Sequence, residues 1–126
     1  MTEHLIRFRR GWRWLNAARQ EQPTLVTLPL PSLAEFPNPF YLARTFQPPT
    51  LNRNAETLWL DLESVRGLVS IELNGEALPR TESDSRVERI PLSDTLPPRN
   101  RLVLQVDVNA VTTAEWGIIA LVIRNI

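Results

Sequence analysis

The amino-acid sequence predicts an all-β protein, folded as an antiparallel β-sandwich or barrel. In many short runs, apolar and polar residues alternate with the period of two that is typical of half-buried strands. The 11 prolines lie at the edges of these runs, between them, or at positions such as Pro79 and Pro91 where a strand would end. No long stretch follows the helical period, so the many short runs favour a sandwich or barrel.

The first expected strand spans residues 5–15, and Gly11 marks a bulge or bend within it. One of its faces is apolar and the other carries arginines: Ile6, Phe8, Trp12 and Trp14 on the first, Arg7, Arg9 and Arg13 on the second. An alternative for part of this stretch is a short helix over residues 14–22, ending before Pro23.

The other strands follow from further alternating runs and one hairpin signal. They are expected at residues 24–28, 41–46, 57–62, 68–74, 87–90, 101–108 and 116–124, with a return strand beginning at Glu76. The Pro-rich segment 29–40 can form neither a helix nor a central strand. Asn74-Gly75 separates two runs, and both residues tolerate the positive φ that a type I′ hairpin turn requires.

The alternation also predicts which side chains share a face. The expected apolar sets are Leu42 with Phe46, opposite Tyr41 and Thr45; Leu58, Leu60 and Leu62, opposite Thr57, Trp59 and Asp61; Val69, Ile71 and Leu73; and Leu102, Leu104, Val106 and Val108. The run at 116–124 is apolar on both faces, which indicates a strand that is covered on both sides.

Length and composition are those of an ordinary soluble domain. The 126 residues fit one domain, spanning residues 1–126, that is large enough to bury a core. The 14 basic residues, all arginine, balance 14 acidic residues, so no long-range field attracts a polyanion. Without cysteine, a disulfide or a thiolate metal site is excluded. No secretory signal and no apolar run long enough for a membrane helix is present, so we expect a cytoplasmic location and no membrane partner.

Two segments carry a family resemblance. "LWLDLESVRGLVSIELNGEAL" and "RIPLSDTLPPRNRLVLQVDV" resemble the N-terminal sugar-binding domain of family 2 glycoside hydrolases, the β-galactosidase and β-glucuronidase group. The landmarks of that pattern fall on Val65, Leu73-Asn74-Gly75, Asp94 with Leu96, and Asn100. "YLARTFQPP" and "WGIIALVIR" resemble the strands that open and close the pattern, so the resemblance covers roughly residues 40 to 125.

The resemblance implies a two-layer antiparallel β-sandwich of the galactose-binding-like jelly-roll type. It also implies an accessory domain, because in these hydrolases the two catalytic carboxylates lie on a separate barrel domain. Between Leu78 and Ile90 the sequence departs from the family pattern, since the usual glycines and aromatic residue are replaced by "PRTESDSRVER". The departure changes a rim that helps shape contacts with sugar or with a neighbouring domain.

The side chains do not indicate catalysis. His4 is the only imidazole, and no serine lies in a G-x-S-x-G nucleophile elbow. With four glycines in all, the chain has no phosphate-binding Gly-rich loop. We therefore expect a protein that is not an enzyme.

Two further segments carry residues that suit a metal ion and a nucleic acid. Glu82, Asp84 and Glu88 offer the oxygen ligands that Ca²⁺ prefers, but nearby arginines favour a solvated loop, and we expect no cofactor. "RFRRGWRW" has the Arg and Trp residues that bind single-stranded nucleic acid. Strand alternation separates them, however, and places the tryptophans in the core, so we expect no nucleic-acid partner.

The sequence thus favours a non-catalytic carbohydrate-binding module, with an accessory role beside a glycoside hydrolase as one interpretation. Aromatic rings stack on sugar rings, and the candidate sugar-binding residues are Tyr41, Arg44, Trp59 and Trp116. The alternative is a structural or protein–protein interaction module that has lost sugar binding. The partner is accordingly a carbohydrate or a protein, and the oligomeric state is open.

Overall fold

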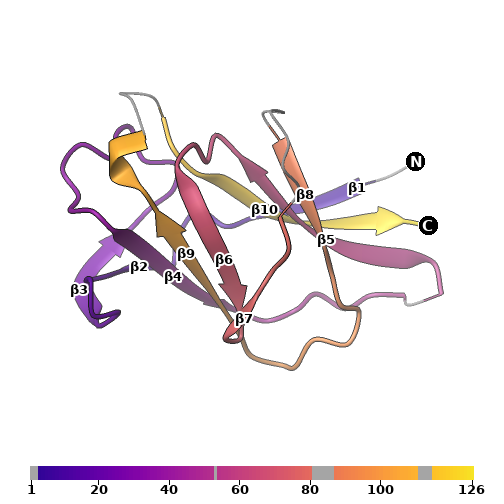
Figure 1. Ribbon diagram of the computed structural model, residues 1–126. Coiled ribbons are helices and arrows are strands. Elements are labelled where there is room, and N and C mark those ends of the chain that lie inside the picture. Colours follow the sequence, from indigo (N-terminus) through magenta and orange to yellow (C-terminus); the bar gives the residue numbers. More distant parts are fainter. Residues whose placement is uncertain (1–2, 53, 81–86, 111–114) are drawn as a thin grey trace.

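The computed structural model is a sandwich of two antiparallel sheets, and it describes residues 3–52, 54–80, 87–110 and 115–126 (Figure 1). Sheet A has the strand order β1 (Glu3–Arg7), β10 (Ile118–Asn125), β5 (Glu56–Glu63) and β8 (Val87–Leu92). Sheet B has the order β3 (Glu21–Val26), β2 (Trp12–Leu15), β4 (Phe40–Phe46), β9 (Asn100–Val106), β6 (Leu68–Leu73) and β7 (Glu76–Ala77). A short 3-10 helix, η1 (Val108–Ala110), follows β9. The predicted all-β sandwich is confirmed.

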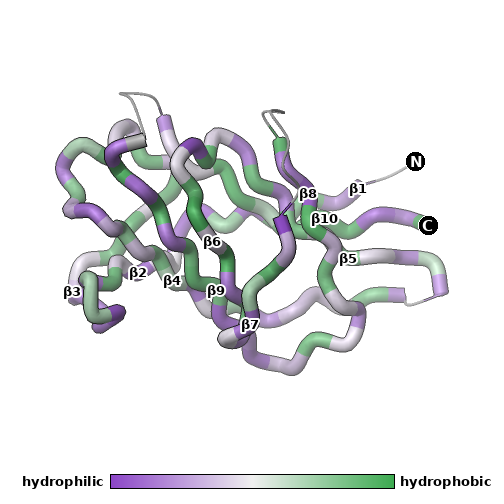
Figure 2. Tube along the Cα trace, in the orientation of Figure 1, coloured by the Kyte–Doolittle hydropathy of each residue, from purple (hydrophilic) through white to green (hydrophobic). Residues whose placement is uncertain are grey.

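The core lies between the two sheets and is built largely from alternate apolar residues of the strands. Figure 2 shows the hydrophobic residues as green segments along the strands. Leu58, Leu60 and Leu62 of β5 are buried there, as the alternation predicts. Burying one such side chain contributes about 1.5–3 kcal/mol relative to leaving it in water. None of the described residues forms a helix with the length and apolar character needed to cross a membrane.

The first expected strand is instead two strands that belong to different sheets. β1 lies in sheet A and β2 in sheet B, and the chain passes between them at Gly11, whose φ is 85°. Phe8 and Trp12 are both buried, because the inner faces of the two sheets point into the same core. The indole Nε1 of Trp12 donates a hydrogen bond to the carbonyl of Phe8 at 2.8 Å. The prediction that this tryptophan enters the core is confirmed.

The alternative helix over residues 14–22 is wrong. β2 and β3 pair as a hairpin, and the side-chain Oδ1 of Asn16 accepts hydrogen bonds from the backbone N–H groups of Ala18 and Gln20 at 2.9 and 3.0 Å. Arg19 adopts a φ of 60° in this turn. The Asn side chain satisfies the turn's backbone donors locally, which favours the turn over a helix. Pro23 lies within β3, which is an edge strand and tolerates a missing N–H donor.

Three further expectations are corrected in detail. A register shift between Leu68 and Ser70 turns Leu68 into the core and leaves Val69 53% exposed, so Val69 does not share a face with the buried Ile71. β9 ends at Val106, and Val108 belongs to η1. Pro91 lies inside β8, where an edge strand allows it.

The predicted Asn74-Gly75 turn is confirmed, and its hydrogen bonds also join the β6–β7 hairpin to β9, the neighbouring strand of sheet B. Both residues have positive φ, 55° and 84°. The Asn74 side chain donates to Asn100 Oδ1 and accepts from the backbone N–H of Arg101, both at 2.9 Å. Asn100 is buried and donates to the carbonyl of Pro97 at 2.9 Å. These landmark residues therefore serve the fold.

Two glycines with nearly equal φ provide a matched test of packing. A Cβ on Gly117 (φ 92°) would lie 3.1 Å from Leu28 Cδ2, so the buried Leu28 side chain would have to shift by a few tenths of an ångström, whereas a Cβ on Gly75 (φ 84°) would have nothing within 4 Å. We expect Gly75→Ala to lower the free energy of unfolding by about 1–2 kcal/mol, from backbone strain alone. Gly117→Ala adds overpacking and should cost about 1–3 kcal/mol more.

Urea denaturation of the two variants measures the difference. Equal losses would contradict the close contact between Gly117 and Leu28.

Candidate functional site

The four sequence-predicted sugar-binding residues are not brought together in one place. Tyr41 lies on the outer face of sheet B and is 9% exposed, and Trp116 lies in the core and is 1% exposed. The guanidinium of Arg19 lies over the Tyr41 ring, 5.1 Å from its centroid. Trp116 Nε1 donates a hydrogen bond to the carbonyl of Arg66 at 2.9 Å. Both rings are covered by the fold itself.

Arg44 is held where the chain passes from sheet A to sheet B. Its guanidinium carbon lies 4.1 Å from the centroid of the Phe8 ring. Its Nε donates to the carbonyl of Arg10 at 2.7 Å, and its Nη1 donates to the carbonyl of Thr45 at 3.1 Å. Burial lowers the pKa of Arg44 from its ordinary value. These contacts give Arg44 a structural role between β4 and the Gly11 bend.

Trp59 is the candidate that remains at the surface. It is half-buried on the outer face of sheet A, opposite the buried leucines of β5, as the alternation predicts. Its Nε1 donates to Thr57 Oγ1 at 2.9 Å, which fixes the ring. Residues in register on adjacent strands share a face, so Trp59 belongs to an apolar row made by Leu5, Val122, Trp59 and Pro91. We call this outer face of sheet A the Trp59 face.

Charged side chains flank the apolar row on both sides. Arg89 donates two hydrogen bonds to the Glu3 carboxylate, each at 2.9 Å, and its Nε lies 2.7 Å from Asp61 Oδ1. Arg124 Nε lies 3.8 Å from Glu3 Oε1. Glu3 and Arg89 come from the two edge strands of the sheet, so their ion pair crosses the outer face. Val122, between Leu5 and Trp59 in the apolar row, is fully buried.

The charges on the Trp59 face shift one another's pKa values. The hydrogen bonds from Arg89 lower the pKa of Glu3, and those to Glu3 raise the pKa of Arg89. The pKa of Asp61 is raised, because desolvation by burial outweighs the opposing contact with Arg89. The Asp61–Arg89 contact is close but not aligned as a hydrogen bond, so Asp61 Oδ1 lies buried without one. A perturbed carboxylate beside a surface tryptophan marks this face as the candidate site.

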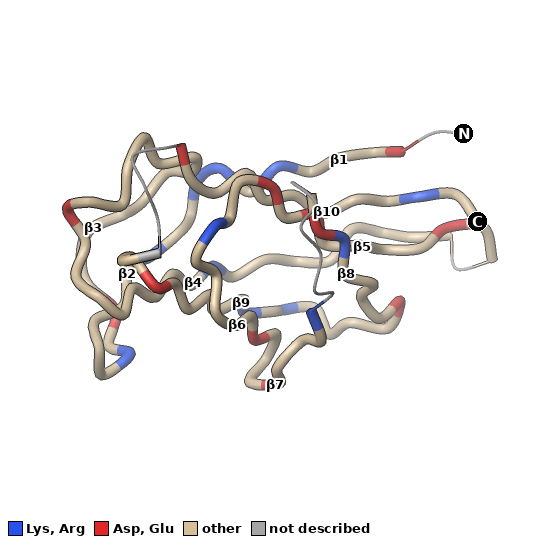
Figure 3. Tube along the Cα trace, turned by 45° about the horizontal axis from the view of Figure 1, so that its top comes forward, with Lys and Arg blue, Asp and Glu red and all other residues tan. Residues whose placement is uncertain are grey.

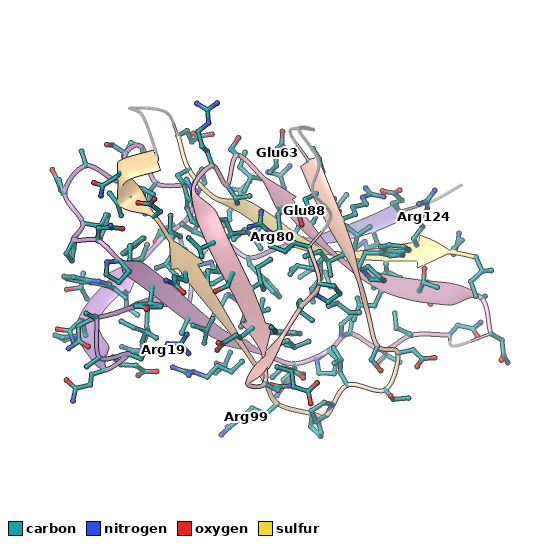
Figure 4. All side chains as sticks on the ribbon, viewed as in Figure 1. Arg19, Glu63, Arg80, Glu88, Arg99 and Arg124 are labelled. Atoms are coloured by element: carbon teal, nitrogen blue, oxygen red, sulfur yellow. The ribbon has the colours of Figure 1, made fainter. Side chains whose placement is uncertain are left out.

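The residues considered for Ca²⁺ fall largely outside the described part of the chain. Glu82 and Asp84 lie there, and nothing tests them. Glu88 is described, and its carboxylate is 3.0 Å from Arg80 Nη2; the two side chains lie side by side in Figure 4. Arg80 also donates to the carbonyl of Leu68. Across the described ranges, no group of three His, Asp or Glu side chains is placed to hold a metal ion.

Among the described residues, a small cavity of about 50 Å³ is lined by Arg44 but not by Trp59, and two other surface cavities involve none of the four candidates. One, of about 270 Å³, lies between Pro48, Leu51 and the loop with Ser93 and Asp94. The other, of about 240 Å³, has an apolar floor of Phe8, Leu28 and Ile119 and is also lined by Arg7, Arg9 and Glu115. A ligand that uses Trp59 would therefore bind on an open sheet surface.

The sequence identified Trp59 and placed Asp61 on its face, but it did not identify Arg89 and Glu3 as their neighbours. The alternation placed Asp61 on the same face as Trp59. Arg89 is opposite Asp61 only because β5 pairs with β8, and Glu3 is 86 residues from Arg89 in the sequence. No local pattern signals such contacts.

Comparison with solved structures finds the same fold in parts of larger glycosidases. An FMN-binding beta-glucuronidase from Facaelibacterium prausnitzii L2-6 matches 96% of this chain with a TM-score of 0.74 at 16% identity. A putative beta-galactosidase from Bacteroides fragilis matches 98% (TM-score 0.64, 14% identity), and the beta-glucuronidase of Ruminococcus gnavus matches 96% (TM-score 0.64, 17% identity). The sequence matches no protein-family model and no curated protein.

The match covers 22%, 23% and 28% of those three chains, so this chain spans about a quarter of their length. The resemblance to the β-galactosidase and β-glucuronidase group is thus confirmed at the level of the fold. At these identities the likeness does not transfer a ligand or an activity.

The partly buried Asp61 carboxyl group predicts a pH-dependent stability. Below the ordinary pKa of Asp the carboxyl is neutral in both the folded and the unfolded protein, and burial carries no charge penalty. Between the ordinary pKa of Asp and the raised pKa of Asp61, the unfolded chain loses its proton before the folded protein does, so the folded state loses stability as the pH rises. We therefore expect the free energy of unfolding of Asp61→Asn, relative to that of the wild type, to rise as the pH rises between these two pKa values. At neutral pH the variant should be at least as stable as the wild type.

Urea denaturation at several pH values measures the change in the free energy of unfolding. Arg89→Gln is the matched variant of opposite sign: it removes the cation beside Asp61 and Glu3 and should lower the free energy of unfolding at neutral pH. A loss of stability at neutral pH in Asp61→Asn would contradict the assignment.

Proposed function

We propose that this chain is a non-catalytic carbohydrate-binding module that binds sugars on the Trp59 face. The observation that carries the proposal is the half-buried indole of Trp59 between two rows of polar side chains. Successive residues on one face of a strand lie about 6.8 Å apart, close to the width of a pyranose ring. A sugar stacked on Trp59 would therefore have Thr57 and Arg124 on one side and Asp61 and Arg89 on the other.

The chemistry of these neighbours suits hydroxyl groups. Carboxylate oxygens accept hydrogen bonds from sugar hydroxyls, and guanidinium groups donate to them. The apolar face of the pyranose would lie on the indole and remove apolar surface from water. Trp59 is already fixed by its hydrogen bond to Thr57, so little side-chain entropy is lost on binding.

The absence of catalysis is part of the same proposal. The likeness to the glycosidases is confined to about a quarter of their length, and the described residues form a sandwich without a barrel. The Trp59 face does carry carboxylates, but Glu3 and Asp61 share one guanidinium, that of Arg89. Carboxylates held in this way are poorly placed to act as a nucleophile and a proton donor on a glycosidic bond. An accessory role beside a glycoside hydrolase fits this arrangement.

The second candidate function is a protein-interaction module. The pairing of Glu3 with Arg89 favours it, because two of the polar groups beside Trp59 already satisfy each other. Leu5 and Val87 add exposed apolar surface to the same face. A protein partner would cover the ion pair without breaking it.

Sugar binding is tested with a glycan array, followed by titration calorimetry with methyl β-D-galactoside and methyl β-D-glucuronide. We expect a weak but measurable affinity, which Trp59→Ala lowers by about tenfold or more because it removes the stacking surface. Trp59→Phe keeps a ring and should retain part of the affinity.

Tyr41→Phe is the matched control. The Tyr41 ring is covered on the other sheet, so this substitution should leave binding unchanged. Circular dichroism confirms that each variant is folded. Absence of binding to every glycan, or binding that survives Trp59→Ala, would contradict the proposal. The first outcome favours the interaction module.

A further inference from the structure

The four edges of the two sheets are not equally protected against pairing with another strand. An edge strand exposes unpaired backbone groups, and natural sheets block such edges with prolines or very short strands. β3 carries Pro23 and β8 carries Pro91, and β7 is only two residues long. β1 is the exception: it has five residues, no proline, and an uninterrupted register with β10. Figure 3 shows it along the border of the molecule.

The backbone of β1 presents a regular set of groups to this open edge. Just after β1, the N–H of Phe8 donates to the carbonyl of Ile119 at 2.8 Å, in line with the β1–β10 register. The direction of backbone hydrogen bonding alternates along an antiparallel strand. The backbone N–H and C=O groups of His4 and Ile6 therefore point towards β10. Those of Glu3, Leu5 and Arg7 point away from it.

The side chains of the same three residues lie on the Trp59 face and form a self-complementary pattern. Leu5 is 48% exposed, although it is a leucine at the centre of the strand. Glu3 and Arg7 lie symmetrically on either side of it. Within the described residues, the Arg7 guanidinium has neither an ion pair nor a hydrogen bond, whereas Glu3 pairs with Arg89 and Arg124.

We propose that β1 pairs antiparallel with β1 of a second copy of this chain, about a two-fold axis at Leu5. This register places Leu5 against Leu5 of the second copy and Glu3 against Arg7 of the second copy, twice. Sliding the register by two residues sets a charged residue against Leu5 and loses both charge pairs. The two four-stranded sheets become one eight-stranded sheet, and Arg7 joins the ion-pair network around Glu3.

The proposed contact is short, and its strength follows from its size. Five residues from each copy bury far less surface than a permanent dimer requires. The dimer should therefore be weak and appear only as the protein concentration rises. It does not depend on sugar binding, and it is measured without any sugar present.

Sedimentation velocity over a range of protein concentrations tests the proposal. The wild type should shift from monomer towards dimer as the concentration rises. Leu5→Lys places two charges against each other at the axis and should raise the dissociation constant about tenfold or more. Leu25→Lys is the matched control. Leu25 is 63% exposed but lies on sheet B, so this substitution should leave the dimer intact.

Charge reversal tests the register. Glu3→Arg alone and Arg7→Glu alone each set like charges against each other and should be monomeric. An equimolar mixture of these two variants restores both opposite-charge pairs and should form a heterodimer, which native mass spectrometry distinguishes by mass.

Circular dichroism establishes that each variant is folded before it is mixed. A wild type that stays monomeric up to its solubility limit overturns the proposal. A dimer that persists in Leu5→Lys overturns it as well, as does a mixture that gives no heterodimer.

Discussion

The constraint on which this structure depends is that both sheets share one dry core and so must turn their apolar residues inward at every second position. Leu60 in β5 and Leu104 in β9 are fully buried from opposite sheets. Because alternate residues of a strand point to opposite faces, this burial directs the intervening residues of each regular strand to an outer face. The chemistry available to the protein is therefore the chemistry of two outer sheet faces and the loops that join them.

The two outer faces are covered in similar ways but to different extents. On sheet B, Arg19 pairs with Glu72 at 3.0 Å and lies over Tyr41, which belongs to a small buried cluster. On sheet A, Arg89 pairs with Glu3 across the face, but Trp59 stays half-buried. Each ion pair joins segments far apart in the sequence. On the outer face of sheet A the Trp59 ring is half-buried, whereas Tyr41 on the outer face of sheet B is 9% exposed, and this difference makes the face of sheet A the candidate site.

The same division explains which parts of the site were predictable. Trp59 was identified correctly as lying opposite the leucines of β5, because that follows from alternation within one strand. Tyr41 and Trp116 have the same aromatic character, but one is covered by the β2–β3 turn and the other by the core. Whether a ring is covered depends on segments that are distant in the sequence. The partnership of Arg89 with Glu3 escaped prediction for the same reason.

The sequence by itself determined the elements whose causes are local. Alternation placed the leucines of β5 in the core, and the positive φ tolerated by Asn74 and Gly75 determined their hairpin turn. Only the tertiary structure decided that the chain changes sheets at Gly11, that the register shifts after Leu68, and which outer face stays open. A periodic pattern reports the two faces of one strand, whereas strand order, register and coverage are set by free energies of contact between segments far apart in the chain.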